Sequence, residues 1–436
     1  MRAMPISPRP VATKKPIGDR RLLAASLYAG MLLLSQGALA QTPGGASPSS
    51  PAPMTEHDSV RLGLARPDIA TLIEATVASA RSDVAEAGRW ANPTLDIGRE
   101  SIKSPLGQNT ERTIELSQQF DVGGKRGLRR DAARERLAAV VADTEQRRVE
   151  IAAEIRQRFY EALYRQKLAA ATGDWERRMS AIAETVKKLH QGGEVAGYDR
   201  RRMALERMTA QTRSRVEQAE YQKALLRLAA LTGDPASPAE PAGDLIPPEP
   251  QALELLLARI DQRPALRAHE RRAGASELDR QAARRAWIPD VTIGLGQKSA
   301  ENGGARDSGT VLSVSVPLPF FDRGQTGQQR AAAQADISRS EARLLRTRLD
   351  GDARALWQQL KQLNAAARDY REQSTTGSRE LVRIAEAAYQ GGESSILELL
   401  DAYKAALEVE QRALELGWNA RRAAIELDTI AGNGKL

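Results

Sequence analysis

The tetrapeptide Gln-Gly-Gly-Glu occurs twice, at residues 191–194 and 390–393, and the two copies start 199 residues apart. Each copy follows a long helix-forming stretch and precedes another. Two adjacent glycines end a helix, because each costs roughly 1 kcal/mol inside it and readily adopts left-handed backbone angles. Each copy is therefore expected to join two long antiparallel helices. We call residues 191–197 the first tip and residues 390–396 the second tip.

The sequence around the tips repeats as well. Arg-Pro at 66–67 precedes Trp90 by 24 and 23 residues, and Arg-Pro at 263–264 precedes Trp287 by the same distances. The chain is therefore predicted to be a tandem duplication of one unit, which consists of a helix, a β-hairpin, a long helix, a tip and a closing helix.

The two predicted units are separated by a proline-rich stretch. Residues 232–250 contain six prolines and are expected to form a linker. The first unit then spans 61–231 and the second 251–431, and 432–436 remain as a short C-terminal tail.

Alternation of apolar and polar residues with period two predicts a β-hairpin in each unit. Leu95 and Ile97 alternate with polar residues, and so do Ile293 and Leu295. The predicted strands span about 92–101 and 111–120 in the first unit, and about 289–298 and 309–318 in the second.

Each hairpin is expected to have one apolar and one polar face. Four such strands cannot stay in a membrane as an open sheet, since their edges would lack hydrogen-bond partners, and they are too few to close a barrel. The chain is therefore expected to oligomerise to 8, 12 or 16 strands. The polar face would line a wet lumen with Thr94, Asp96, Glu115, Ser117, Ser313 and Ser315. A soluble coiled-coil protein is the alternative for the helical pattern alone.

Five aromatic residues lie at the helix-proximal ends of the predicted hairpins. They suit an aromatic girdle at the periplasmic face of a membrane, and the alternative is that they anchor the core at helix–strand junctions. These residues are Trp90, Phe120, Trp287, Phe320 and Phe321.

The N-terminus is expected to be a secretory signal peptide. Residues 1–40 combine Arg20 and Arg21, an apolar run and a final Ala-Leu-Ala. Residues 41–60 are rich in Pro, Gly, Ser and Ala and are expected to be a disordered lead-in. Without residues 1–40, which hold six basic residues and one acid, the formal charge falls from +8 to +3. The basic balance therefore gives little support to nucleic-acid binding.

Residue types also limit the chemistry of the chain. It has no cysteine, so disulfides, cysteine nucleophiles and thiolate metal sites are excluded. His57, His190 and His269 lie far apart, and no metal-protease or phosphate-loop motif occurs. Gly123-Gly124-Lys125 superficially suggests a phosphate cradle, but the equivalent corner of the second unit lacks that pattern. No enzyme activity, cofactor or resident metal is expected.

The layout resembles the TolC-like outer-membrane efflux proteins. The segments that carry the resemblance are ANPTLDIG with LSQQFDVGGKRG, their counterparts WIPDVTIG with SVPLPFFDRG, and YQGGESSILELLDA. It covers residues 66–431, and the first-half segments look most like the branch that serves heavy-metal efflux pumps of the cobalt–zinc–cadmium type. Many relatives carry an N-terminal lipid anchor, for which this chain has no cysteine.

The resemblance implies a mainly α fold with a small membrane β-barrel. It implies a homotrimer with a 12-stranded barrel in the outer membrane of a Gram-negative bacterium, in contact with outer-membrane lipid, and a long periplasmic α-helical barrel. It also implies docking to a periplasmic adaptor (membrane fusion) protein and an inner-membrane RND-type pump.

The resemblance also implies site residues. Acidic residues just after the second tip line the closed periplasmic aperture in the family, which places Glu398 and Asp401 there; the alternative is that both simply face solvent. In the first unit Asp199 matches Glu398, whereas Arg202 matches Asp401, and an Arg202–Asp401 pair is a possible latch. Adaptor docking is expected at the tips, at Gly192, Gly193, Glu194, Gly391, Gly392 and Glu393.

Three functions stay open at this point. The first is the outer-membrane exit duct of a tripartite system for heavy-metal cations. The second is the same channel exporting drugs or a secreted protein. The third is a periplasmic coiled-coil adaptor or scaffold.

Overall fold

The computed structural model describes residues 53–105, 107–233, 238–302 and 304–432. The predicted signal peptide, most of the predicted lead-in and the C-terminal tail lie outside these residues.

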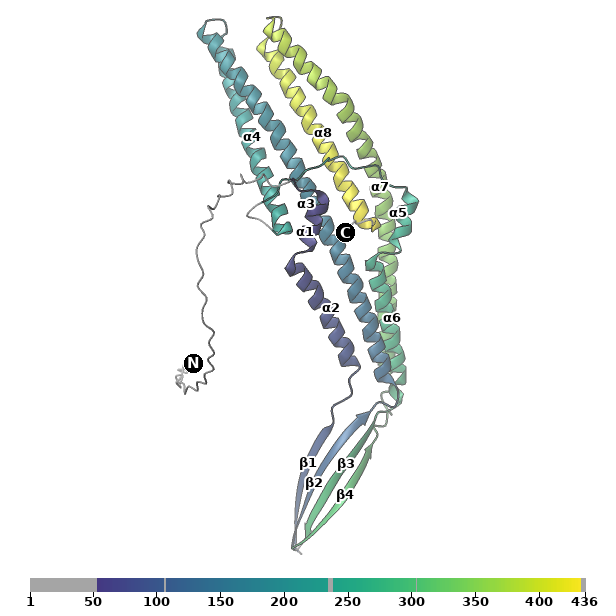
Figure 1. Cartoon of the computed structure of the whole chain (residues 1–436). Helices are drawn as coiled ribbons and strands as arrows, with labels where there is room; N and C mark the ends of the chain where they lie inside the picture. Colours follow the sequence, from purple (N-terminus) through teal and green to yellow (C-terminus); the bar gives the residue numbers. More distant parts are fainter. Residues whose placement is uncertain (1–52, 106, 234–237, 303, 433–436) are drawn as a thin grey trace, which may run out of the picture. The chain divides into compact units, whose positions relative to one another are not determined.

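Within the described residues the tandem duplication is confirmed (Figure 1). The first unit runs α2 (Pro67–Ala87), β1 (Thr94–Ser104), β2 (Gly107–Phe120), α3 (Lys125–Gln191) and α4 (Gly197–Thr232). The second runs α6 (Pro264–Arg284), η1 (Arg285–Trp287), β3 (Val291–Asn302), β4 (Ala305–Ser315), α7 (Gln325–Gln390) and α8 (Ile396–Ala431). The short helices α1 (Glu56–Leu64) and α5 (Leu253–Ile260) precede the two units.

The helices pack as two long hairpins. Helix α3 packs along α4 and α7 along α8, and contacts between α3 and α8 join the hairpins. At about 1.5 Å per residue, the 67 residues of α3 extend over roughly 100 Å. Two apolar clusters bury the seams. One is centred on Phe159 and Leu228, and the other on Leu360 and Leu427.

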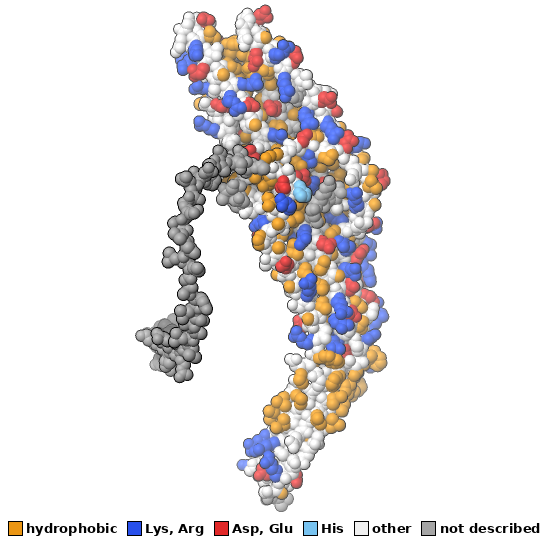
Figure 2. Space-filling model, in the orientation of Figure 1, with side chains coloured by type: hydrophobic (Ala, Val, Ile, Leu, Met, Phe, Trp, Pro, Cys, Tyr) orange, Lys and Arg blue, Asp and Glu red, His pale blue; other side chains and the backbone are white. Residues whose placement is uncertain are grey.

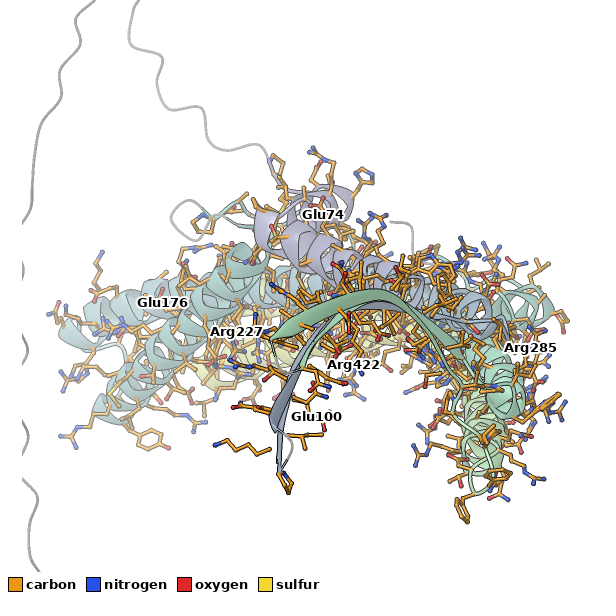
Figure 3. The ribbon with its side chains drawn as sticks, turned by 90° about the horizontal axis from the view of Figure 1, so that it is seen from below. Glu74, Glu100, Glu176, Arg227, Arg285 and Arg422 are labelled. Atoms are coloured by element: carbon orange, nitrogen blue, oxygen red, sulfur yellow. The ribbon has the colours of Figure 1, made fainter. Side chains whose placement is uncertain are left out.

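The four strands form one antiparallel sheet in the order β1-β2-β3-β4. The strands lie where alternation predicted them but extend further toward their turns, because residues 102–104 pair with residues 107–109. Strand β4 ends at Ser315, three residues before the predicted end, and Pro317 just beyond it has no N–H to give to a ladder. Figure 3 shows the sheet as a curved surface when it is seen from below.

The apolar residues of the sheet share one face. Leu95, Leu116, Leu295 and Leu312 are register partners across all four strands, and Ile97 lies opposite Ile114 in the next row of that face. All six side chains are more than half exposed. The sheet therefore has an apolar face that nothing within the described residues covers.

The Arg-Pro pair of each unit caps the helix that closes the same unit. The Arg66 guanidinium donates to the carbonyl of Ala230 at 2.5 Å, and that of Arg263 donates to the carbonyls of Thr429 and Ile430. These carbonyls lie in the last turns of α4 and α8, where intrahelical donors are missing. The two caps differ in burial: Arg263 is 5% exposed, whereas the Arg66 side chain is 28% exposed and pairs with Asp68.

The predicted lead-in is wrong for its last residues. Helix α1 begins at Glu56, capped by the Thr55 hydroxyl, and Met54 exchanges backbone hydrogen bonds with Glu240 and Ala242. The composition of residues 41–60 is that of a disordered segment, but Glu56 has specific partners. Its carboxylate pairs with Arg156 and accepts a 2.6 Å hydrogen bond from the Tyr160 hydroxyl.

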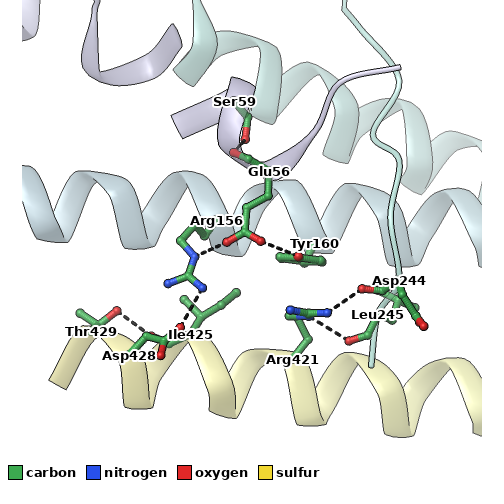
Figure 4. A network of polar contacts seen from close by, with 10 residues as sticks. All are labelled: Glu56, Ser59, Arg156, Tyr160, Asp244, Leu245, Arg421, Ile425, Asp428 and Thr429. Atoms are coloured by element: carbon green, nitrogen blue, oxygen red, sulfur yellow. Dashed lines mark hydrogen bonds and ion pairs between the residues drawn. The ribbon is translucent and has the colours of Figure 1, made fainter. Parts of the chain in front are cut away.

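The Glu56 contacts belong to a buried polar network (Figure 4). Arg156 also pairs with Asp428 of α8 at 2.9 Å, so one guanidinium links α1, α3 and α8. Burial raises the pKa of the Glu56 carboxyl, but the charge of Arg156 and the Tyr160 hydrogen bond outweigh it, so the pKa is lowered overall. The network therefore holds Glu56 ionised.

Residues 238–250, the second part of the proline-rich linker, are packed against the helices. Arg421 of α8 donates to the carbonyls of Asp244, Leu245 and Ile246 at 2.8–3.0 Å. The amide of Asn364 on α7 donates to the carbonyls of Pro247 and Pro248. Prolines lack N–H groups but keep their carbonyls, and α7 supplies the donors for these two.

The two arginine caps provide a matched test of the fold. Arg263→Ala leaves two helix-terminal carbonyls without this donor in a buried place and is expected to reduce stability by about 2–3 kcal/mol. Arg66→Ala is expected to cost about 1 kcal/mol, since water reaches its carbonyls. Thermal unfolding followed by circular dichroism measures both. Equal losses for the two variants would contradict the assigned role of burial.

Candidate functional site: the helical tips and the polar sheet face

Both tips have the same backbone geometry. The N–H of Glu194 donates to the carbonyl of Leu189 at 3.0 Å, and that of Gly193 to His190 at 3.1 Å; the second tip repeats this with Glu393 and Gly392. This pattern is the Schellman motif, which requires one residue with left-handed angles. Gly193 and Gly392 fill that position with φ of +82° and +74°.

The first glycine of each tip has ordinary helical angles. Gly192 and Gly391 have φ of −77° and −74°, so the turn does not require glycine there. No atom lies within 4 Å of the place where a Cβ of Gly193 or Gly392 would stand. The tips therefore present bare backbone that a neighbouring chain can approach closely.

A side chain braces the first tip. The His190 Nδ1 lies 2.8 Å from the carbonyl oxygen of Val195, so this ring holds the first tip. In the second unit Tyr389 takes the place of His190. Burial raises the pKa of the Tyr389 hydroxyl, and the negative charge of Asp199 raises it further.

Glu398 has a structural partner that sequence reasoning missed. It completes a capping box with Ser395: its carboxylate accepts from the Ser395 N–H at 2.9 Å, and the Glu398 N–H donates to the Ser395 hydroxyl. The S-x-x-E signature at 395–398 could have revealed it. The first unit has Ala196 at the equivalent position, without a side-chain cap. Glu398 therefore both starts α8 and presents a carboxylate at the tip.

The other three predicted gate residues lie at the same end of the helices. Asp199 and Arg202 are on the first turns of α4, and Asp401 is exposed on α8. No salt bridge joins Arg202 to Asp401 among the described residues of one chain. The contact between these helices lies about one turn further along, where Lys404 pairs with Glu206 at 2.7 Å.

The predicted girdle residues are open to the surroundings. Trp90 and Phe120 meet edge to face with ring centroids 6.0 Å apart, and the Arg126 guanidinium lies 3.6 Å from the centre of the Trp90 ring. Trp287 and Phe320 are more than half exposed, and Phe321 is 95% exposed.

The Gly-Gly-Lys corner is a structural turn. Asp121 accepts backbone N–H groups of Gly123 and Arg126, and Asp322 accepts that of Gly324 in the second unit. Lys125 is buried. Its ammonium donates a hydrogen bond to the Ile288 carbonyl and forms a salt bridge with Asp290, both at 2.8 Å. The lysine thus ties the two units together.

The polar face of the sheet is strongly acidic. The register places five acids and one base on it, a formal net charge of −4 among the described residues: Asp96, Glu100, Glu111, Glu115, Asp307 and Lys298. Lys298 pairs with Glu111 at 2.5 Å, and the Ser313 hydroxyl donates to Glu115. A Cβ at Gly294 would overlap the Glu115 carboxylate, so this glycine makes room for it. Sequence reasoning found Asp96 and Glu115 but not Glu100, Glu111 and Asp307. Glu100 and Glu111 lie at the ends of the predicted strands, and Asp307 lies outside them.

The described residues lack two features. They contain no group of three or more His, Asp or Glu side chains arranged to hold a metal ion. None of their helices combines the length and apolar character needed to cross a membrane.

Comparison with known proteins gives consistent matches. Residues 255–433 match the family model described as Outer membrane efflux protein. The cobalt-zinc-cadmium resistance protein CzcC of Cupriavidus metallidurans is 29% identical over 335 residues, which is 73% of this chain and 77% of CzcC. The nickel-cobalt-cadmium resistance protein NccC of Alcaligenes xylosoxydans is 27% identical over 64% of this chain and 63% of NccC.

Solved structures share the fold. The CmeC outer membrane channel of Campylobacter jejuni superposes with a TM-score of 0.71 at 15% identity, over 87% of this chain and 86% of CmeC. The outer membrane protein VceC of Vibrio cholerae gives 0.68 at 18% identity, over 86% of this chain and 96% of VceC. The TolC-like fold predicted from the sequence is confirmed.

Proposed function

We propose that the chain is an outer membrane efflux protein that forms the outer-membrane exit duct of a tripartite efflux system, and that its cargo is heavy-metal cations. The match of residues 255–433 to that family model supports the proposal. The relatives CzcC, NccC and CnrC are all named as metal-resistance proteins, which supports that class of cargo. The fold is that of channels rather than of enzymes, and metal ions would pass through as substrate.

The sheet supports assembly as a trimer in the outer membrane. Strands β1 and β4 are its two edges, and each has one side without a partner strand in a single chain. Pairing β1 of one copy with β4 of the next satisfies both edges, and three copies would give 12 strands. The apolar face would then meet lipid, with the exposed aromatic residues as the girdle at the periplasmic side.

The acidic polar face is the observation that carries the cation assignment. In a closed barrel it would line the lumen, and three copies would place 15 carboxylates against three lysines there. Like charges in a narrow wet passage focus the potential and raise the local concentration of cations. Such focusing needs no metal site, which suits a duct that must release its cargo.

The assignment is tested by deletion and complementation in the source bacterium. Loss of the chain is expected to sensitise cells to zinc, cobalt or cadmium and to leave antibiotic tolerance unchanged. A variant with Asp96→Asn, Glu100→Gln and Asp307→Asn removes three acids that make no salt bridge among the described residues. It is expected to restore metal tolerance only in part and to lower cation selectivity in planar bilayers.

The control variant changes residues of the same types away from the sheet, with Asp352→Asn, Glu372→Gln and Glu408→Gln on α7 and α8. It is expected to behave as wild type. Sensitisation to antibiotics instead of metals would favour the duct for drugs. A chain absent from outer-membrane fractions would favour the periplasmic scaffold and overturn the proposed function.

We further propose that Glu398 and Asp401 form two rings of carboxylates at the periplasmic gate. The pair Glu398→Gln and Asp401→Asn removes both charges, and glutamine keeps the capping box, so α8 still starts at the same residue. Loss of these charges is expected to open the gate, which gives a several-fold increase in single-channel conductance with weaker cation selectivity. Glu408→Gln with Glu410→Gln, further along α8, is the control. Conductance equal to wild type in the gate variant would exclude the gate role.

The tips are proposed to dock a periplasmic adaptor that connects to an inner-membrane RND-type pump. A photo-crosslinker in place of Glu194 or Glu393 is expected to capture the adaptor in cells, whereas one in place of Glu372 on α7 is not. Gly192→Val and Gly391→Val add side chains where the backbone angles tolerate them, and should lower metal tolerance without loss of the protein from the outer membrane. If neither tip position captures an adaptor, the docking role is contradicted.

A further inference from the structure

The apolar face of the sheet ends in arginines. The row nearest the helices holds Phe120 opposite Val291, and the four register-partnered leucines follow further along the face. Ile97 lies opposite Ile114 in the row after the leucines. In the next row Arg99 lies directly opposite Arg112. The six residue steps from Phe120 to Ile114 cover about 20 Å at about 3.4 Å per residue. Figure 2 shows the same order, with hydrophobic side chains over the part of the sheet nearer the helices and Lys and Arg side chains nearer the turns.

The arginine pair has no counter-charge. Both side chains are exposed, and neither makes a salt bridge or hydrogen bond with another described side chain. Lys103 and Arg306 lie further out on the same face, and its only described acid is Glu301, the register partner of Arg306. Like charges directly opposite one another on a sheet are destabilising, so an anion from outside the chain would stabilise this pair.

A second copy of the chain would not supply that anion. Pairing β1 with the β4 strand of a neighbour keeps the residues of each face together. On this face β4 carries Arg306, Ser308, Thr310, Leu312 and Val314, none of them acidic. The acids of the sheet other than Glu301 all lie on the opposite face. The counter-charge must therefore come from what surrounds the apolar face.

We propose that Arg99 and Arg112, with Lys103 and Arg306 beside them, bind the phosphate groups of a phosphorylated lipid in the outer leaflet. This inference rests on the proposed function, since it takes the apolar face to be the lipid face and its aromatic end to be periplasmic. The arginines then lie at the headgroup level of the far leaflet. A guanidinium fits a phosphate with two parallel hydrogen bonds, which a free lysine ammonium cannot match.

The test compares lipids that differ in phosphate. The detergent-solubilised protein is mixed with diphosphoryl lipid A, monophosphoryl lipid A or phosphatidylcholine, and bound lipid is counted by native mass spectrometry. Wild type is expected to prefer the diphosphoryl form. Arg99→Gln with Arg112→Gln is expected to bind it roughly ten-fold more weakly for each lost charged contact, and Arg99→Lys with Arg112→Lys to fall in between.

The matched control is Arg89→Gln with Arg323→Gln, which removes two exposed arginines at the helix end of the sheet and should retain wild-type binding. Equal binding of the three lipids by wild type, or unchanged binding by the Arg99 and Arg112 variant, would overturn the inference. The same variants are followed in outer-membrane fractions and in metal tolerance. A wild-type protein absent from that membrane would refute the proposed function itself, whereas correct localisation with no phosphate preference would refute the lipid site alone.

Discussion

The unsatisfied edges of the four-stranded sheet constrain everything else in this protein. Strands β1 and β4 each leave one row of backbone groups without partners in a single chain, and the leucine row across all four strands is exposed. In water such a sheet would aggregate, and in a membrane its open edges would be too costly. Closure with other copies and an apolar surrounding remove both problems together. The sheet thus favours the proposed assembly before any contact between helices is considered.

The duplication explains how one chain supports such a sheet. In each unit the closing helix runs back along the long helix. The arginine of the Arg-Pro pair at the start of the unit caps the last turn of that closing helix. Lys125 joins the first unit to the second at the strand–helix corners, and Arg156 joins α1, α3 and α8. The units are equivalent in backbone but unequal in side chains. Only the second tip has a capping box, and only the second arginine cap is fully buried.

Local patterns in the sequence predicted the repeated order of elements, the position of the tips and the apolar face, since each depends on residues close together in the chain. The strand ends were predicted too short: the predicted strands stopped at residue 101 and resumed at residue 111, but cross-strand pairing extends the ladder through residues 102–104 and 107–110. The order of residues 56–60 depends on Arg156 and Tyr160, a hundred residues away, and no local pattern encodes it. The Glu206–Lys404 salt bridge could not be predicted from the sequence either, because it depends on how far α4 and α8 are shifted along each other.

The two faces of the sheet carry opposite charge, and this asymmetry connects the fold to the proposed transport. Successive residues of a strand lie on opposite faces of the sheet. Strands β1 and β2 can therefore hold negative charge such as that of Asp96 on the polar face and positive charge such as that of Arg112 at the rim of the apolar face. Phosphates outside would neutralise the rim, whereas mobile cations inside would neutralise the acids. A duct built in this way favours cations through the field of many carboxylates rather than through a binding site. In the proposed duct, such a field would attract cations without thiolate ligands and would let them pass without holding them.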